Sequence, residues 1–252
     1  METIIYNYFV YAWIGVALLI FPILLFVTPP YGRHSRKGWG PLIPNRIGWI
    51  IMELPALLVF LLFALSGAAP KSMVVWLFIL LWSLHYINRS LIYPLRIKTT
   101  GKKMPFSVAL MAIFFNLVNG FINGYFLGHI QPKYPEYWLS DPRMIIGVML
   151  FIFGLALNLQ SDEKLLSLRS GGTNGYQIPH GGLFNKISCP NFFGEIVEWL
   201  GFALMTWSIA GLSFFIWTAV NLIPRALDHH RWYKTTFNDY PAERKAVFPY
   251  LL

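Results

Sequence analysis

The sequence predicts an all-α integral membrane protein with seven transmembrane helices, its N-terminus outside and its C-terminus in the cytoplasm. The first observation is composition: 56% of the 252 residues are hydrophobic and only 12% are charged, about half the charged share of a soluble domain. The second is a series of apolar stretches about 20 residues long, the length that crosses a bilayer. The third is the uneven distribution of Lys and Arg between the loops.

This composition excludes several classes of protein. A water-soluble globule, a disordered chain and a nucleic-acid-binding domain are excluded, although the formal net charge of +9 would otherwise favour nucleic acid. The single cysteine, Cys189, excludes an internal disulfide framework and a multi-cysteine metal site. We therefore expect no metal centre.

Five membrane helices are evident from the apolar stretches, and a longer stretch is ambiguous. The first stretch has no basic segment before it, so we expect a retained anchor and not a cleaved signal peptide. The five helices are expected at roughly 8–28, 47–68, 72–95, 105–128 and 144–166.

The ambiguous stretch, 192–224, is long for one helix and short for two, and charge decides between them. With seven helices, 17 of the 20 Lys and Arg residues lie on the cytoplasmic side. With six helices the split becomes 12 to 8, so the positive-inside rule favours seven. The sixth helix is then short, near 192–207, and the seventh runs from about 210 to 235 and extends into the cytoplasm.

Polar side chains inside the predicted spans indicate a functional site, because they are costly in lipid and usually face inward. Glu53 lies one or two turns into the second helix, where the alternative is a carboxylate stabilised by the helix dipole. Tyr86, Arg89, Tyr93 and Arg96 form one stripe of the third helix. The alternative there is an aromatic belt with snorkelling arginines, which suits Tyr86 least because it lies deepest.

The later helices carry similar stripes. Asn116, Asn119 and Asn123 share one face of the fourth helix, although asparagines also serve helix packing in membranes. On the fifth helix Asp162 and Arg169 could form a simple interfacial ion pair. The remaining stripe residues are Asn158, Asp162 and Arg169 on the fifth helix and Glu195 and Glu198 on the sixth.

The two acids of the short sixth helix need partners. We expect these partners in the basic cluster of the seventh helix, with mutual salt bridging as the alternative to a functional role. The polar groups together predict a partly cationic chamber that opens to the cytoplasm and takes a phosphorylated ligand, because arginine is the usual partner of phosphate. The expected basic cluster comprises Arg225, His229, His230 and Arg231.

Several longer motifs carry a resemblance to a known family. The C-terminal half contains them at 157–162, 178–184, 191–199, 229–233 and 239–245, and the N-terminal half adds 53–55, 85–89, 119–120 and 123–125. Through these motifs the chain closely resembles the steroid 5α-reductases (3-oxo-5α-steroid 4-dehydrogenases) over nearly its whole length.

The resemblance implies a single membrane-embedded domain, 1–252, that reduces the C4–C5 double bond of 3-oxo-Δ4-steroids with NADPH. It implies that Tyr86 stabilises the developing enolate at the C3 oxygen and that Glu53 assists. Helices one to four then form the substrate side and 144–252 the cofactor half. The NADPH residues implied are Arg96, Asn119, Asn158, Asp162, Arg169, Tyr176, Asn191, Glu195, Glu198, Arg225, His229 and Tyr233. The partners expected are a steroid or steroid-like lipid and membrane lipid, with the chain a monomer.

One departure from the family pattern leaves the substrate open. Met52 stands where eukaryotic members often carry glutamine, next to the expected carbonyl. The compact length and single cysteine favour a bacterial inner membrane, with the endoplasmic reticulum as the alternative.

Three other functions compete. They are reduction of another enone or enoyl lipid, methyl transfer of the isoprenylcysteine type, and transport of a lipid or anion. Glu53 and Tyr86 argue against methyl transfer, which has no carbonyl to polarise, and the lack of an internal repeat argues against transport.

Overall fold

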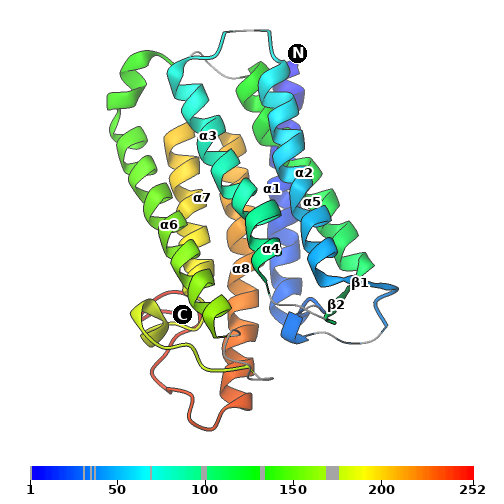
Figure 1. The fold of residues 1–252 in the computed structure, drawn as a ribbon. Coiled ribbons are helices and arrows are strands. Elements are labelled where there is room, and N and C mark those ends of the chain that lie inside the picture. The colour runs from blue at the N-terminus through cyan, green and yellow to red at the C-terminus, as the bar shows by residue number, and fades with distance from the viewer. Residues whose placement is uncertain are drawn as a thin grey trace.

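The computed structural model describes residues 2–30, 32–34, 36, 38–68, 70–97, 101–130, 134–168 and 176–252, which form a bundle of long helices (Figure 1). The long helices are α1 (Glu2–Phe26), α2 (Asn45–Ser66), α3 (Met73–Ile87), α5 (Phe106–Tyr125), α6 (Pro142–Ser167), α7 (Pro190–Thr206) and α8 (Ile209–Thr236).

Shorter elements extend or connect these helices. The π-helical segment η2 (Asn88–Ile92) and α4 (Tyr93–Arg96) continue α3, and the π-helical segment η3 (Phe126–Ile130) continues α5. Strands β1 (Leu42–Pro44) and β2 (Lys103–Pro105) pair antiparallel. The 3₁₀ turns are η1 (Gly32–His34), η4 (Glu136–Ser140) and η5 (Gly182–Asn185).

The prediction of an all-α membrane protein is confirmed. Within the described residues, six helical segments are long and apolar enough to cross a membrane, with α3 to α4 counted as one and α5 to η3 as another. The helix α7 has 17 residues and is not among them. All seven predicted helices are present close to their expected ends, whereas seven membrane crossings and the orientation stay predictions.

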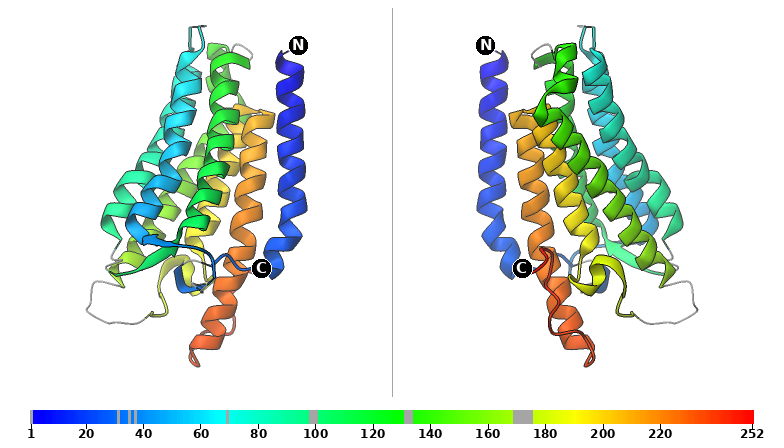
Figure 2. Two further views of the ribbon diagram at one scale, coloured as in Figure 1. Left: turned by 90° about the vertical axis from the view of Figure 1, so that its right-hand side faces the viewer. Right: turned by 90° about the vertical axis from the view of Figure 1, so that its left-hand side faces the viewer.

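Consecutive long helices run in opposite directions, and the chain termini lie at opposite ends of the bundle (Figure 1). The helix α7 packs against α6 and α8, α8 packs against α1, and α2 packs against α5. Figure 2 shows α1 at the edge of the bundle and the C-terminal end of α8 projecting beyond the other helices.

A tight turn divides the ambiguous apolar stretch into two helices. Trp207, at the end of α7, has the left-handed φ of 43°, which is uncommon for a residue with a side chain. The Ser208 side chain then accepts a hydrogen bond from the Gly211 backbone N–H at 3.0 Å and caps α8. The cap and the reversal explain why 33 apolar residues form a hairpin instead of one long helix.

Glycines bring the helices of two pairs close together, as small residues do in membranes. A Cβ at Gly201 would lie 2.5 Å from the carbonyl oxygen of Gly147 on α6. A Cβ at Gly194 would lie 2.7 Å from the Asn158 backbone nitrogen. The pair α2 and α5 meets in the same way, since a Cβ at Gly124 would lie 2.5 Å from the carbonyl oxygen of Phe60.

An aromatic cluster fills the centre of the bundle. Trp82 of α3 contacts Phe60 at 4.5 Å between ring centroids, Trp199 at 5.0 Å and Phe214 at 4.8 Å. These rings come from four helices, so the cluster joins α2, α3, α7 and α8 beside the polar residues described next.

Candidate functional site

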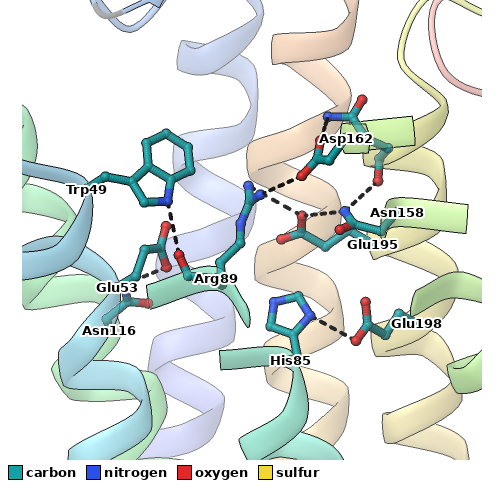
Figure 3. Close-up of polar contacts among 10 residues, drawn as sticks. Trp49, Glu53, His85, Arg89, Asn116, Asn158, Asp162, Glu195 and Glu198 are labelled. Carbon is teal, nitrogen blue, oxygen red and sulfur yellow. Dashed lines mark hydrogen bonds and ion pairs between the residues drawn. The ribbon is translucent and has the colours of Figure 1, made fainter. Parts of the chain in front are cut away.

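Arg89 lies at the centre of a buried polar network. Its guanidinium pairs with Asp162 of α6 at 3.2 Å and lies 3.7 Å from a carboxylate oxygen of Glu195 on α7. Asn158 donates to Glu195 at 3.3 Å, and Asn191 donates to Asp162 at 3.2 Å. Figure 3 shows Arg89 between Glu53 and Asn116 on one side and these α6 and α7 side chains on the other.

The π-helical segment η2 and a tryptophan set the position of Arg89. A π turn accommodates an extra residue and changes the direction of the side chains that follow, and such turns are frequent at functional sites. Trp49 of α2 donates its indole N–H to the Arg89 carbonyl at 3.1 Å, and the guanidinium lies 5.1 Å from the Trp49 ring centre. Trp49 therefore supports both the backbone and the charge of Arg89.

Glu53 lies across the site on α2, partly buried. The Asn116 amide of α5 donates to the Met52 carbonyl at 2.5 Å and reaches the Glu53 carboxylate at 3.5 Å. Asn116 thus ties the Glu53 turn of α2 to α5. The stripe of asparagines predicted on this helix is divided, because Asn123 donates to the backbone of its own helix, at 3.1 Å from the Asn119 carbonyl, and to no other group that the structure describes.

Tyr86 is buried among rings, and its hydroxyl is available. Its ring centroid lies 5.2 Å from that of Trp82 and 5.9 Å from that of Trp199. Among the residues that the structure describes, no group hydrogen-bonds the Tyr86 hydroxyl, and Glu53 and Tyr86 are not joined directly.

Glu198 does not join the Arg89 network. It is fully buried, and one of its oxygens lies 2.8 Å from Nδ1 of His85 (Figure 3). Glu195, one turn earlier on the same helix, faces Arg89 instead. The two acids of α7 therefore have separate partners.

The expectation that basic residues of α8 pair with these acids is wrong. The helices α7 and α8 run antiparallel from the turn at Trp207, so residues equally far from the turn lie side by side. Arg225 lies farther from the turn than either acid, and the cluster from Arg225 to Arg231 therefore lies toward the start of α7 and the loops. Arg231 pairs with Asp228 of its own helix at 2.7 Å.

A second cluster lies at the cytoplasm-facing end of the predicted topology, around Arg33 of η1. The guanidinium carbon lies 4.5 Å from the Trp232 ring centre, 4.8 Å from that of Tyr233 and 5.1 Å from that of Tyr176. The Lys102 ammonium lies 5.3 Å from the Tyr176 ring. The Nη1 nitrogen of Arg33 is buried and has no hydrogen-bond partner among the described residues.

His34, next to Arg33, connects this cluster to α8. Its Nε2 lies 2.9 Å from Nδ1 of His229, and the two rings stack. Burial, followed by the positive charge of Arg33, lowers the pKa of His34 below its usual value. His34 is therefore mostly neutral at pH 7.

The predicted cofactor residues that the structure describes thus occupy two clusters and four other places, one of which is Glu198 at His85. Asn119 hydrogen-bonds Trp13 of α1 at 3.2 Å, and Arg96 pairs with the exposed Glu163 at 2.5 Å. Arg169 lies outside the described residues. The Arg89 network contains Asn158, Asp162, Asn191 and Glu195, the Arg33 cluster contains Tyr176, His229 and Tyr233, and Arg225 lies on α8 near the latter.

Three residues of the site were missed as site residues at the sequence level. The sequence places Arg89 in the polar stripe and His85 in a family motif without a specific role for either, and a regular helix cannot distinguish inward Arg89 from outward Arg96. Arg33 lies in a loop, where no apolar context marks a charged residue as unusual. The predicted cofactor residues Tyr176 and Tyr233, which Arg33 contacts, are the sequence signal that points to this cluster.

Comparison with known proteins identifies the family. The sequence profile of 3-oxo-5-alpha-steroid 4-dehydrogenase matches residues 102–252. The chain is 42% identical to the steroid 5-alpha-reductase DET2 of Gossypium hirsutum over 258 residues, covering 99% of this chain and 98% of that protein. The chain belongs to the 3-oxo-5-alpha-steroid 4-dehydrogenase family.

Animal members of the family are similar as well. The 3-oxo-5-alpha-steroid 4-dehydrogenase 1 of Bos taurus is 38% identical, with 100% of this chain and 98% of that protein covered. That of Homo sapiens is 40% identical, with 88% and 85% covered. The predicted family and its enzymatic class are confirmed, and the integral membrane location agrees with the six long apolar helices.

Proposed function

We propose that this protein reduces the C4–C5 double bond of a 3-oxo-Δ4-steroid, or of a closely similar enone lipid, with NADPH. The observation that carries the proposal is the available hydroxyl of Tyr86, set in aromatic surroundings next to a polar network, with Glu53 on the neighbouring helix α2. The names of the plant and animal relatives agree with this reaction class. We further propose that the protein acts as a monomer. Its Arg89 network and Arg33 cluster lie toward the cytoplasmic side.

The aromatic surroundings of Tyr86 suit a steroid. The Tyr86 ring lies 5.2 Å from the Trp82 ring, 5.9 Å from the Trp199 ring and 6.5 Å from the Phe214 ring, so that side chain lies among aromatic rings. An apolar ligand with one carbonyl oxygen matches such a site, since a few placed polar groups fix the orientation of a ligand in an apolar pocket. Met52, buried beside Glu53, adds to the apolar character at that end.

The two polar clusters fit a dinucleotide phosphate. The Asn158 side-chain oxygen and the Nη1 nitrogen of Arg33 are both buried without a hydrogen-bond partner in the described chain, and such groups normally have one. Arg33 with Lys102 offers positive charge beside aromatic faces. We propose that Asn158, Asn191 and Glu195 hold the nicotinamide end and that Arg33, Tyr176, His229 and Tyr233 hold the adenosine phosphate end.

The chemistry assigned to the chain is polarisation of the enone. NADPH, when bound, supplies the hydride for C5. As negative charge grows on the C3 oxygen, the Tyr86 hydroxyl donates a hydrogen bond to it, and Glu53 supports this arrangement from the opposite helix. A donor that acts mainly on the developing charge raises turnover more than it raises substrate affinity. Burial of the aromatic cluster excludes water from the site.

Binding experiments with the purified protein test the cofactor assignment. We expect NADPH to bind well and NADH poorly, because the Arg33 cluster offers positive charge for the additional phosphate. Replacement of Arg33 by Gln should weaken NADPH binding by about 1.5–3 kcal/mol, the scale of a lost charged hydrogen bond. Equal affinity for both cofactors would contradict the phosphate assignment. Binding of S-adenosylmethionine instead of NADPH would favour the methyltransferase alternative.

A further inference from the structure

A buried polar pair crosses the aromatic cluster directly beside Tyr86. His85 of α3 and Glu198 of α7 are 3% and 0% exposed, and Nδ1 of His85 lies 2.8 Å from an oxygen of Glu198 (Figure 3). The second oxygen of Glu198 is buried and has no hydrogen-bond partner among the described residues. Within the described residues, neither His85 nor Glu198 forms a hydrogen bond with a member of the Arg89 network.

The pair is continuous with Tyr86 in both sequence and space. His85 precedes Tyr86, and Glu198 precedes Trp199. The His85 ring lies 4.7 Å from the Trp199 ring, and the Tyr86 ring lies 5.9 Å from it. Two consecutive residues of α3 therefore contact two consecutive residues of α7. His85 makes the polar contact with Glu198, and Tyr86 makes the aromatic contact with Trp199.

One partner of the pair is rigidly held, and the other lies where its helix changes form. A Cβ at Gly154 of α6 would lie 2.7 Å from the Glu198 Cα, so α6 closely packs against the backbone at Glu198. His85 lies at the end of regular α3, where the Asn88 N–H bonds to the carbonyls of both His85 and Leu84 before the π segment begins. Glu198 thus gives a fixed point to a stretch of α3 whose hydrogen-bond pattern is changing.

Stability alone does not account for this pair. Replacement of a buried polar pair by apolar residues of similar volume is often neutral or stabilising, and such pairs are best attested as devices that fix register. The neighbouring core is aromatic, so apolar residues would suit both positions. A role in fixing the register of the turn that carries Tyr86 therefore accounts for the pair better than stability does.

We propose that His85 and Glu198 are positioning residues that hold Tyr86 at the substrate carbonyl, and that Glu198 acts through His85 and not as a ligand of the cofactor. The inference rests on the proposed function and extends it to two residues outside the reacting groups. Its consequence is that the pair affects turnover only while the Tyr86 hydroxyl is present.

A double-mutant cycle tests this consequence. His85→Leu should lower turnover by about 10- to 100-fold, the scale of a misplaced catalytic group, with NADPH affinity and steroid KM little changed. In the Tyr86→Phe background, the same replacement should cost less than about twofold, because residues that act as a unit are not additive. His85→Asn, whose amide lies near the position of Nδ1, should restore most of the turnover.

Folding is controlled by replacing both partners. The variant His85→Leu/Glu198→Leu leaves no unpaired polar group, so it should fold and bind NADPH while it keeps the turnover defect. His129→Leu is the matched control, since His129 is an exposed histidine that contacts Ser66 at 3.1 Å near the other end of the bundle. It should leave turnover unchanged.

A measurement without substrate separates this inference from the proposed function. In protein labelled at the tyrosine ring carbon that bears the hydroxyl, Tyr86→Phe identifies the signal of Tyr86 among the 13 tyrosines. Glu198→Gln and His85→Leu should both shift that signal, and His129→Leu should not. A wild-type protein without steroid turnover but with these shifts would overturn the proposed function and leave the positioning pair supported. An unshifted Tyr86 signal, additive losses in the cycle, or weakened NADPH binding in Glu198→Gln would overturn the pair.

Discussion

At the scale of the residue, Arg89 joins the two sides of the site. Its backbone carbonyl accepts a hydrogen bond from the Trp49 indole of α2, and its guanidinium lies over the Trp49 ring. The same guanidinium pairs with acids of α6 and α7. A planar guanidinium can serve two carboxylates at once, whereas an ammonium is a single point of charge. The identity of the cation, and not only its sign, therefore matters at this position.

Arg89→Lys should weaken NADPH binding although the charge is kept. The single ammonium nitrogen of lysine cannot reach both Asp162 and Glu195, so Asn158 and Asn191, which bond these acids, lose their alignment. We expect a loss of about 1.5–3 kcal/mol in binding free energy, measured by titration of the purified protein. Arg96→Lys is the matched control, because the exposed pair with Glu163 is worth little. Equal affinities of the Arg89→Lys protein and the wild type would contradict a role of the network in cofactor binding.

Glu53→Gln tests the carboxylate opposite Tyr86. If the carboxylate supports the developing enolate through its charge or proton, turnover should fall by about 10²–10³, as for one lost oxyanion donor. NADPH affinity should stay unchanged, because the proposed phosphate-binding groups lie elsewhere. Glu163→Gln serves as the control for a carboxylate of the same chain on the exposed surface. A fall in NADPH affinity that accounts for the whole loss would contradict the assignment.

At the scale of the element, the α6–α7 pair aligns the cofactor side of the site through its glycines. The Asn158 side chain of α6 donates to the Asn191 carbonyl of α7 at 3.0 Å, which requires the close approach at Gly194. A Cβ there would meet the Asn158 nitrogen and the Gly154 carbonyl oxygen, both at 2.7 Å and both parts of the backbone.

Gly194→Ala should therefore destabilise the protein and weaken NADPH binding together. Backbone atoms cannot move aside as a side-chain end can, so we expect a loss of about 1–3 kcal/mol from overpacking, measured by thermal unfolding in detergent. Gly15→Ala is the control, because nothing lies within 4 Å of a Cβ at Gly15. Equal unfolding temperatures for the two variants would show that the helices separate without cost.

The C-terminal segment covers the base of α7, and the single cysteine reports on it. The Cys189 N–H donates to the Ala246 carbonyl at 3.1 Å, and Val247 packs in the same apolar cluster. Burial raises the pKa of the Cys189 thiol to about 12, so only about one thiol in 10⁴ is ionised at pH 8. Since the thiolate is the reactive form, maleimide labelling of the folded protein should be very slow. Deletion of residues 246–252 should accelerate it, and rapid labelling of the intact chain would contradict the docking of this segment.

At the scale of the whole molecule, the helices follow from the sequence more fully than the site does. Apolar length predicts the positions of the helices, and the distribution of charge favours two helices over one in 192–224. The free-energy cost of polar side chains in lipid predicts Asn158, Asp162 and Glu195 as site residues. All three belong to the Arg89 network. The outward direction of Arg96 was not predictable, because the π turn breaks the regular helical period on which the stripe from Tyr86 to Arg96 was based. The partner of Glu198 was not predictable either, since a contact across helices depends on their relative register.

The orientation of the bundle is a prediction for the molecule as a whole. The termini lie at opposite ends (Figure 1), and 17 of the 20 Lys and Arg residues belong to the side of the C-terminus in the predicted topology. A reporter fused after Leu252 should be active only in the cytoplasm. Activity of that reporter on the other side of the membrane would contradict the orientation and the cytoplasmic access of the Arg33 cluster.

The central claim is that the Tyr86 hydroxyl polarises the carbonyl of an enone lipid while hydride is delivered from NADPH. The most direct measurement is steady-state reduction of a 3-oxo-Δ4-steroid by the wild type, Tyr86→Phe and Tyr134→Phe. Tyr134 is the matched control, since its buried hydroxyl bonds the Thr206 carbonyl at 2.5 Å. We expect turnover to fall by about 10²–10³ in Tyr86→Phe alone, with NADPH affinity unchanged. Near-normal turnover in Tyr86→Phe, or an equal loss in Tyr134→Phe, would contradict the claim.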